Sequence, residues 1–149
     1  MAHLEPLADE SFDLIVHPVS NVFAPELQPV WNEAFRVLRP GGVLLTGFTN
    51  PDLYLFDVEH GKATGELRVK YSLPYSDIES LTDAERAKYT DNDEPLEFSH
   101  TFEEQLGGQL AAGFVLTAFF EDTWEPGDDD VLIGRYMATF FATRAVKPG

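Results

Sequence analysis

The sequence predicts an α/β fold, in which an open sheet with parallel strands is covered by helices. Two observations support this. An apolar strand pattern, an amphipathic helix pattern and a second strand pattern follow one another over residues 12–49, and a helix pattern with two further strand patterns occupies residues 101–146. A strand, helix and strand of this length are typical of a right-handed parallel crossover. With 149 residues, the chain has the size of a single domain.

The first unit is predicted from its apolar spacing. Residues 12–17 form a short apolar run with β-branched side chains after a polar turn, which predicts a buried strand. A helix is expected over residues 27–39 and is stopped by Pro40 and the two glycines after it, before a second strand at residues 43–49. The helix face consists of Leu27, Val30, Trp31, Ala34, Phe35 and Leu38.

The pattern is weaker over residues 51–99, which we interpret as an insertion. Residues 67–71 predict a short strand, and a capping box at residues 82–85 predicts a short polar helix that ends near Tyr89. The segment shows no sequence pattern of a second domain. It is therefore expected to lie outside the sheet.

Regular patterns return at residue 101. A capping box at residues 101–104 predicts a helix that ends near Gly113 and packs on the sheet. Strands are predicted at residues 114–124 and 136–146, joined by the acidic loop 125–130, with either a hairpin or a short helix from Val131. The side of the helix expected to face the sheet carries Phe102, Leu106 and Leu110.

Composition excludes several function classes. The net charge is −16, from 26 acidic and 10 basic residues, which disfavours nucleic acid as a partner. The four histidines are scattered, so no metal site is predicted. The sequence has no cysteine, no apolar run long enough for a membrane span and no signal-peptide pattern at its start. These features predict a cytoplasmic protein without membrane contact.

Two motifs resemble the class I S-adenosylmethionine-dependent methyltransferases. They are DESFDLIV at residues 9–16 and RVLRPGGVLL at residues 36–45, the second typical of the small-molecule branch of that family. The resemblance implies the fourth strand, helix and fifth strand of the family fold, followed by two strands of which the last is antiparallel and inserted between its neighbours. It therefore implies a partial Rossmann-like methyltransferase sheet, made of the last four strands, with residues 51–99 as a lid-like insertion.

The family's glycine-rich cofactor loop has no counterpart, because the sequence contains no Gly-x-Gly cluster after a strand. We therefore expect residues 1–149 to be a single, incomplete methyltransferase domain, the carboxyl-terminal portion of a truncated chain. The missing loop also makes another interpretation, a dinucleotide-dependent dehydrogenase, less favourable. Whether the chain is active alone is left open.

The resemblance implies S-adenosylmethionine as cofactor and a small molecule as methyl acceptor. Ligands bind at the carboxyl ends of strands in such sheets, and His17 is a candidate general base there because its pKa allows proton transfer at neutral pH. The implied cofactor-binding residues are Met1, Ala2, His17, Pro18, Ser20 and Phe23. The implied substrate-binding residues are Asn21, Asn50, Tyr54, Tyr71 and Tyr75.

Structural roles remain open for each candidate. His17 is equally explained as a cap of a buried strand, Ser20 and Asn21 as turn formers, and Asn50 before Pro51 as a turn residue. Phe23 and the tyrosines are also explained by core packing. The functional alternative is a non-catalytic half-domain that pairs with another chain, such as a second copy in a homodimer, through the exposed edge of strand 12–17.

Overall fold

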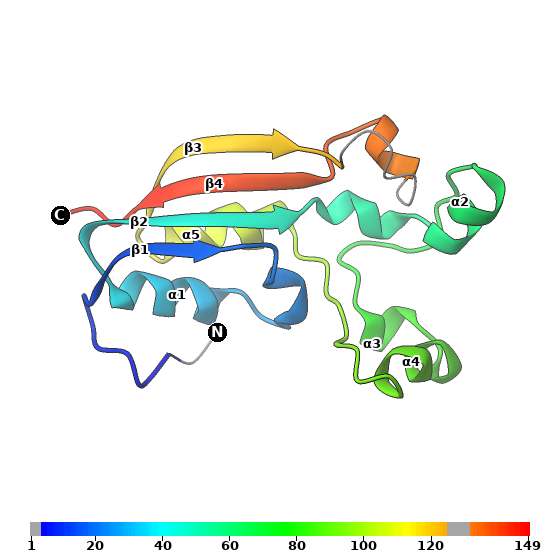
Figure 1. Cartoon of the computed structure of the whole chain (residues 1–149), viewed down its shortest axis with the longest axis horizontal. Coiled ribbons are helices and arrows are strands. Elements are labelled where there is room, and N and C mark those ends of the chain that lie inside the picture. Colours follow the sequence, from blue (N-terminus) through cyan, green and yellow to red (C-terminus); the bar gives the residue numbers. More distant parts are fainter. Residues whose placement is uncertain (1–3, 125–131) are drawn as a thin grey trace.

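The computed structural model describes residues 4–124 and 132–149. In these residues the strands form one sheet, in the order β1-β2-β4-β3 (Figure 1). β1 is parallel to β2, and β4 is antiparallel to both of its neighbours. The predicted α/β sheet with an inserted, antiparallel last strand is confirmed. The strands are β1 (Phe12–His17), β2 (Leu38–Thr49), β3 (Val115–Asp122) and β4 (Phe140–Val146).

The helix α1 (Gln28–Val37) is shorter than predicted, and β2 begins directly after it. Helical angles are disfavoured for the residue before a proline, so the helix ends ahead of Arg39 and not at Pro40. The Pro-Gly-Gly segment lies within β2, where the pairing with β1 shifts its register. Gly41 has a φ of 81°, which suits glycine at such an irregularity.

The prediction that β1 is a buried strand is wrong. Leu14 is 51% exposed and Val16 is 64% exposed. β1 is an edge strand, and only its other face, with Ile15 and His17, packs against the core. An apolar run alone does not distinguish a strand covered on both faces from an edge strand.

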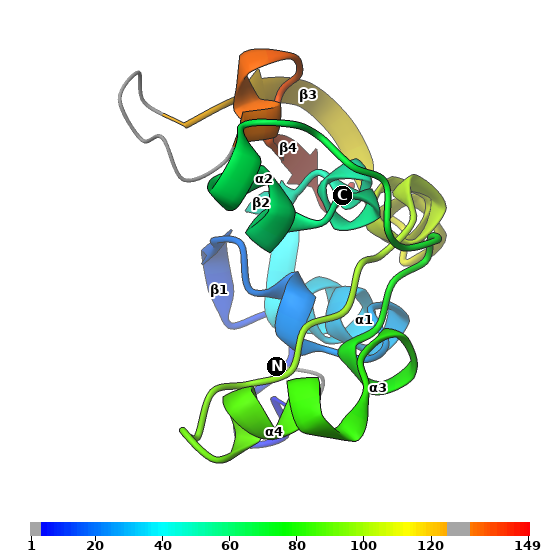
Figure 2. The same cartoon turned by 90° about the vertical axis from the view of Figure 1, so that its right-hand side faces the viewer.

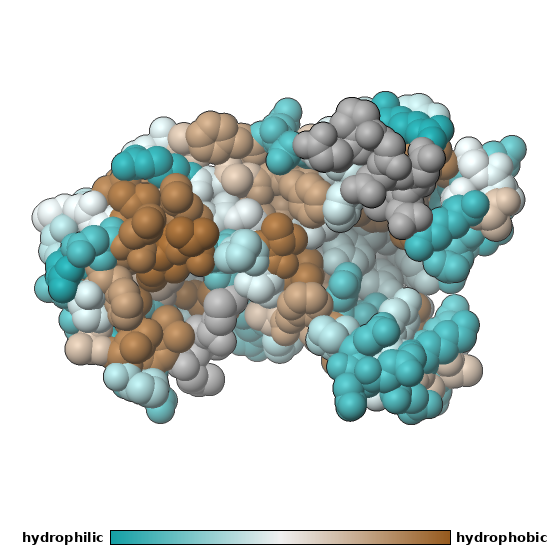
Figure 3. Space-filling model, viewed as in Figure 1, coloured by the Kyte–Doolittle hydropathy of each residue, from teal (hydrophilic) through white to brown (hydrophobic). Residues whose placement is uncertain are grey.

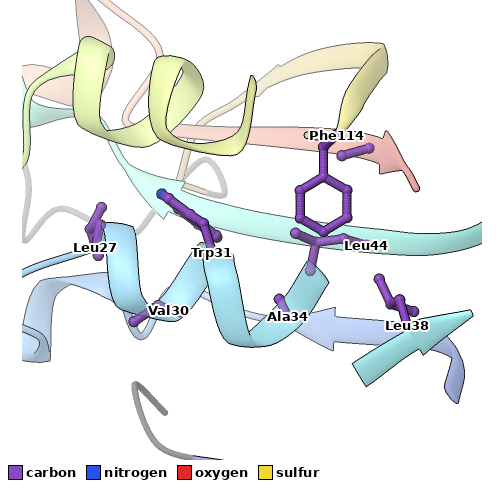
Figure 4. Packing of buried hydrophobic residues seen from close by; sticks show 8 residues of the cluster. Leu27, Val30, Trp31, Ala34, Leu38, Leu44 and Phe114 are labelled. Atoms are coloured by element: carbon purple, nitrogen blue, oxygen red, sulfur yellow. The ribbon is translucent and has the colours of Figure 1, made fainter. Parts of the chain in front are cut away.

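The core lies between α1 and the sheet, with Trp31 at its centre (Figure 4). The Trp31 side chain has no exposed surface, and the rings of Phe35 and Phe114 meet edge to face 5.1 Å apart. The predicted apolar face of α1 is confirmed in this cluster. The cluster consists of Leu27, Val30, Trp31, Ala34, Leu38, Leu44, Phe114 and Ala145.

The capping box of Thr101 and Glu104 is confirmed by its reciprocal hydrogen bonds. The helical segment after it contains the π-helical turn η3 (Glu103–Gly107) and then α5 (Gly108–Ala111). The predicted packing face is wrong: Leu110 is 55% exposed. The residues that are buried instead are Gln105, Gly108 and Gln109.

Close packing explains this rotation of the helix. A Cβ atom at residue 108 would lie 2.6 Å from Cδ1 of Trp31, so only glycine fits there. The π turn also adds a residue to the helical turn, which moves the apolar stripe away from the sheet. Phe102 nevertheless keeps an edge-to-face contact with Phe141 of β4, at 5.3 Å between the ring centroids.

Residues 51–99 lie beyond the carboxyl end of β2, apart from the sheet (Figures 1 and 2). The predicted strand at residues 67–71 is wrong, because only an isolated bridge joins Phe56 to Val69. The predicted capping box of Thr82 and Glu85 is confirmed at the start of α4. The helices of this segment are η2 (Pro51–Leu55), α2 (Val58–Thr64), α3 (Asp77–Ser80) and α4 (Asp83–Thr90).

The last strand begins at Phe140 and is shorter than predicted, and the 3-10 helix η4 (Leu132–Arg135) precedes it, in keeping with the short-helix alternative for the connection. The acidic loop 125–130 and Val131 lie outside the described residues. None of the helices in the described part of the chain has the length and apolar character needed to cross a membrane.

One face of the sheet is not covered by α1 or α5, which both pack on the opposite face (Figure 2). Figure 3 shows apolar side chains gathered on this side over β1 and β2. We call it the open face. Its exposed large apolar residues, placed by strand register, are Leu14, Val16, Leu45, Val115 and Phe120.

Candidate functional site

An open cleft of about 1250 Å³ lies between the ends of β1 and β2 and the segment 51–99. Its sheet side is formed by residues just after β1 and at the end of β2, and its other side by tyrosines and charged residues of the segment. Figure 3 shows the molecule hollowed in this region. The carboxyl ends of parallel strands are the usual ligand position in open α/β sheets. The cleft therefore coincides with the predicted site.

The turn after β1 contributes apolar surface to the cleft. Val19, Val22 and Phe23 line it, and Phe23 is 48% exposed. Pro18 is exposed beside them, and Ser20 is half-buried. Met1 and Ala2 lie outside the described residues. The cofactor-binding roles of these residues remain predictions.

His17 and Asn21 belong to a buried polar network behind this turn. Nε2 of His17 lies 2.5 Å from Oδ1 of Asn21, and Nδ2 of Asn21 donates to Oε1 of Gln105 at 2.6 Å. His17 also meets Trp31 edge to face, 5.9 Å between ring centroids. The Asn21 oxygen can only accept, so Nε2 of His17 is the donor of this hydrogen bond. The buried hydrogen bonds of His17 and Asn21 hold the turn after β1 in position. A catalytic role for His17 and a substrate role for Asn21 remain predictions.

His100 was not anticipated from the sequence, since nothing distinguishes it from the other scattered histidines. Its Nε2 atom lies 3.1 Å from the carbonyl oxygen of Asn21 and 2.8 Å from that of Ala24. Both oxygens belong to the short 3-10 helix η1 (Asn21–Phe23) and its cap. His100 thus holds the wall of the cleft from behind.

We expect stability to fall at acidic pH through His17. Burial lowers the pKa of His17 below its ordinary value of 6.5, so the unfolded chain binds a proton at a pH where the folded chain does not. The free energy of unfolding therefore decreases as the pH falls below about 6.5, by up to ~1.4 kcal/mol per pH unit. His17→Gln, which still donates to Asn21 but does not titrate, is expected to flatten this slope in urea unfolding between pH 7 and 5.5. Equal slopes in the two proteins would contradict the expectation.

Asn50 ends β2 and caps the helix η2. Its Nδ2 atom donates to the carbonyl oxygen of Ala138 at 2.8 Å, and its Oδ1 atom accepts from the Asp52 amide at 3.0 Å. The side chain, 3% exposed, thus joins the start of the segment to the residues before β4. These contacts explain Asn50 as a turn residue, and its substrate-binding role stays a prediction.

The three predicted tyrosines do come together in the cleft. Tyr54 stacks on Tyr75 with ring centroids 5.1 Å apart, and Tyr71 meets Tyr75 edge to face at 5.0 Å. The hydroxyl of Tyr54 donates to Glu97 and that of Tyr75 to Asp77, each at 2.6 Å. Burial, and then these carboxylates, raise the pKa of both phenols, so they remain protonated donors. We call these five residues the tyrosine–carboxylate cluster.

Asp77 and Glu97 are the site residues that the sequence did not reveal. They are 20 residues apart and occur in segments with many other acidic residues, so no pattern singled them out. Their partnership depends on the fold, in which the Glu97 amide donates to Oδ2 of Asp77 at 2.7 Å. Within the described residues, no group of three or more His, Cys, Asp or Glu side chains is arranged to hold a metal ion.

Sequence comparison links the chain to methyltransferases. The family model described as a methyltransferase domain matches residues 1–46. The uncharacterised methyltransferase YbaJ of Bacillus subtilis is 46% identical over 147 residues, which are 99% of this chain and 55% of that protein. The chain thus spans about half the length of this relative.

Fold comparison agrees. An S-adenosylmethionine-dependent methyltransferase from Mesorhizobium loti superposes with a TM-score of 0.64 at 16% identity, over 94% of this chain and 63% of that one. Another from Methanosarcina mazei gives a TM-score of 0.60 at 18% identity, over 99% of this chain and 64% of that one. The chain is thus similar in sequence to methyltransferases over about half of such a protein, and its fold is that of class I S-adenosylmethionine-dependent methyltransferases.

Proposed function

We propose that the chain supplies the acceptor side of an enzyme that methylates a small molecule with S-adenosylmethionine. The observation that carries this proposal is the cleft, which joins the apolar turn after β1 to the tyrosine–carboxylate cluster. A volume of about 1250 Å³ leaves room for two ligands side by side, because the pocket of a single drug-sized ligand holds roughly 300–1,000 Å³.

The residues fit a cofactor whose methionine end lies against the turn after β1. Phe23 offers a half-exposed ring and Val19 an apolar surface. We further propose that residues 51–99 act as a lid over the acceptor, and that the glycine-rich loop is supplied by polypeptide corresponding to the rest of the relatives' length. A cytoplasmic location is part of this proposal, supported by the cysteine-free sequence.

The cofactor supplies an electrophilic methyl group on a sulfonium sulfur. With the cofactor bound, transfer of this methyl group to an acceptor atom would be an in-line displacement at the methyl carbon. Such a displacement needs alignment of the two reactants more than acid–base chemistry. In this chain the network of His17, Asn21 and Gln105 holds the turn after β1 in place, and the tyrosines orient the acceptor.

Titration calorimetry with S-adenosylhomocysteine tests the cofactor part of the proposal. We expect saturable binding, weakened roughly tenfold by Phe23→Ala, since truncating a ring that covers a ligand removes about 1–2 kcal/mol. Phe120→Ala is the matched control, because Phe120 is similarly exposed but lies on the open face. A folded sample that takes up no ligand would contradict a cofactor site in this chain.

A second candidate function is a non-catalytic half-domain that pairs with another chain. The specific observation in its favour is β1, an edge strand whose Leu14 and Val16 are more than half exposed. Unpaired backbone groups beside apolar side chains are a template for association. In this case the function of the sheet is to form a homodimer and not to support catalysis. The molar mass in solution would show such a dimer.

A further inference from the structure

We propose that the methyl acceptor carries a cationic amine, which binds at the tyrosine–carboxylate cluster. The amine lies against the stacked rings of Tyr54 and Tyr75 and beside the carboxylates of Asp77 and Glu97. The inference rests on the proposed function in placing the acceptor in this cleft. It names the chemical class of that acceptor, which the comparisons leave open.

The cluster is a built site, in which each carboxylate is fixed beside a ring. Asp77 is only 6% exposed, and its two oxygens accept from the Tyr75 hydroxyl at 2.6 Å and the Glu97 amide at 2.7 Å. Glu97 accepts from Tyr54 through one oxygen, and its other oxygen forms no hydrogen bond within the described residues. The rings of Tyr54 and Tyr75 are stacked, so their carboxylates lie on the same wall of the cleft.

Charge distinguishes this wall from the rest of the cleft. Of the other carboxylates that line the cleft, Asp57 is paired with Arg68, Glu59 with Lys62 and Glu85 with Lys70, and Glu94 is exposed to solvent. Within residues 4–124 and 132–149, no Lys or Arg forms an ion pair with Asp77 or Glu97. Neutral phenols donate to these two carboxylates instead, which leaves their negative charge unbalanced.

The cluster already accepts a cation at its rim. Nζ of Lys70 lies 4.7 Å from the ring centroid of Tyr71, which in turn contacts Tyr75. An ammonium group is attracted by the face of an aromatic ring and by a carboxylate, and both attractions grow where water is excluded. A substrate amine therefore gains from two features of this wall, whereas an uncharged acceptor gains from neither and an anionic one is repelled.

Choline and its uncharged isostere 3,3-dimethylbutan-1-ol are matched probes, since they differ only in the nitrogen that carries the charge. Each is titrated into the full chain, followed by the tyrosine ring signals in NMR. We expect choline to bind at least roughly tenfold more tightly than the alcohol. Glu97→Gln, whose side-chain oxygen still accepts from Tyr54, should remove most of this difference.

Glu94→Gln is the control variant, because Glu94 lines the same cleft but is exposed and outside the cluster. It is expected to leave the choline preference unchanged. If Glu97→Gln does not fold, Tyr54→Phe provides a second test: it keeps the ring and releases Glu97, and should weaken choline binding several-fold without changing binding of the alcohol.

Equal binding of choline and the alcohol would overturn the inference, as would choline binding that Glu97→Gln and Tyr54→Phe leave intact. Failure to detect choline at the tyrosines would also overturn it. The cofactor titration is independent of these results. Choline selectivity without S-adenosylhomocysteine binding would support a cationic site and remove the proposed enzyme, whereas the reverse would leave an enzyme with another acceptor class.

Discussion

Trp31→Ala is expected to lower the free energy of unfolding by about 3–5 kcal/mol, the usual cost of truncating a buried Trp. The side chain has no exposed surface and packs among residues of α1 and the sheet. Its removal opens a cavity against Gly108 and leaves the carbonyl oxygen of Glu104 without its donor, now 2.9 Å from Nε1. Urea unfolding followed by far-UV circular dichroism measures the loss.

Trp124→Ala is the matched control. Trp124 is 39% exposed and meets Phe140 edge to face at 4.8 Å, so its truncation should cost only about 1 kcal/mol. A loss for Trp31→Ala as small as that of the control would show that the packing of α1 against the sheet is not the main source of stability.

Under the pairing function proposed as the second candidate, Val16→Lys is expected to weaken self-association of the chain by at least roughly tenfold, since burying a valine side chain contributes about 1.5–3 kcal/mol. Val16 is 64% exposed on the open face, next to the free edge of β1. A lysine there places a charge where a second chain would pack. Sedimentation equilibrium over a range of concentrations gives the dissociation constants of both proteins.

Val69→Lys controls for the added charge, because Val69 is 65% exposed and belongs to the segment 51–99, away from the sheet. It should leave association unchanged. A wild-type chain that stays monomeric at about 100 µM, well above the dissociation constants of specific pairs, would contradict the pairing role. Equal weakening by both lysines would point to net charge as the cause.

Local patterns predicted much of the fold. The spacing of apolar residues in α1 found its buried face, and the capping boxes at Thr82 and Thr101 found two helix starts, because these signals depend on residues close in sequence. The motifs at residues 9–16 and 36–45 found the family. Each of these signals depends only on residues close in sequence, so it can be recognised without the tertiary structure.

Errors arose where distant residues decide the outcome. Gln105 and Gln109 are buried because Asn21 and Thr143 donate to their side-chain oxygens, and the apolar pattern of this helix contains no sign of these distant contacts. The tyrosines were found as aromatic residues of an insertion, whereas Glu97 joins the cluster through contacts with Tyr54 across 43 positions and with Asp77 across 20. Exposure of β1 depends on which strands lie beside it, which a single strand pattern does not contain.

The position of β4 has a consequence for synthesis of the protein. The strand made last lies between β2 and β3, so these two have no backbone pairing with each other until residues 140–146 leave the ribosome. A nascent chain therefore exposes the unpaired edge of β2, and later that of β3, until β4 follows, and the pairs between β2 and β4 join distant positions, from Thr49 with Phe140 to Val43 with Val146. Loss of only the last ten residues would remove β4 and separate β3 from β1 and β2. The damage to the sheet would thus be far larger than the small fraction of the chain that is lost.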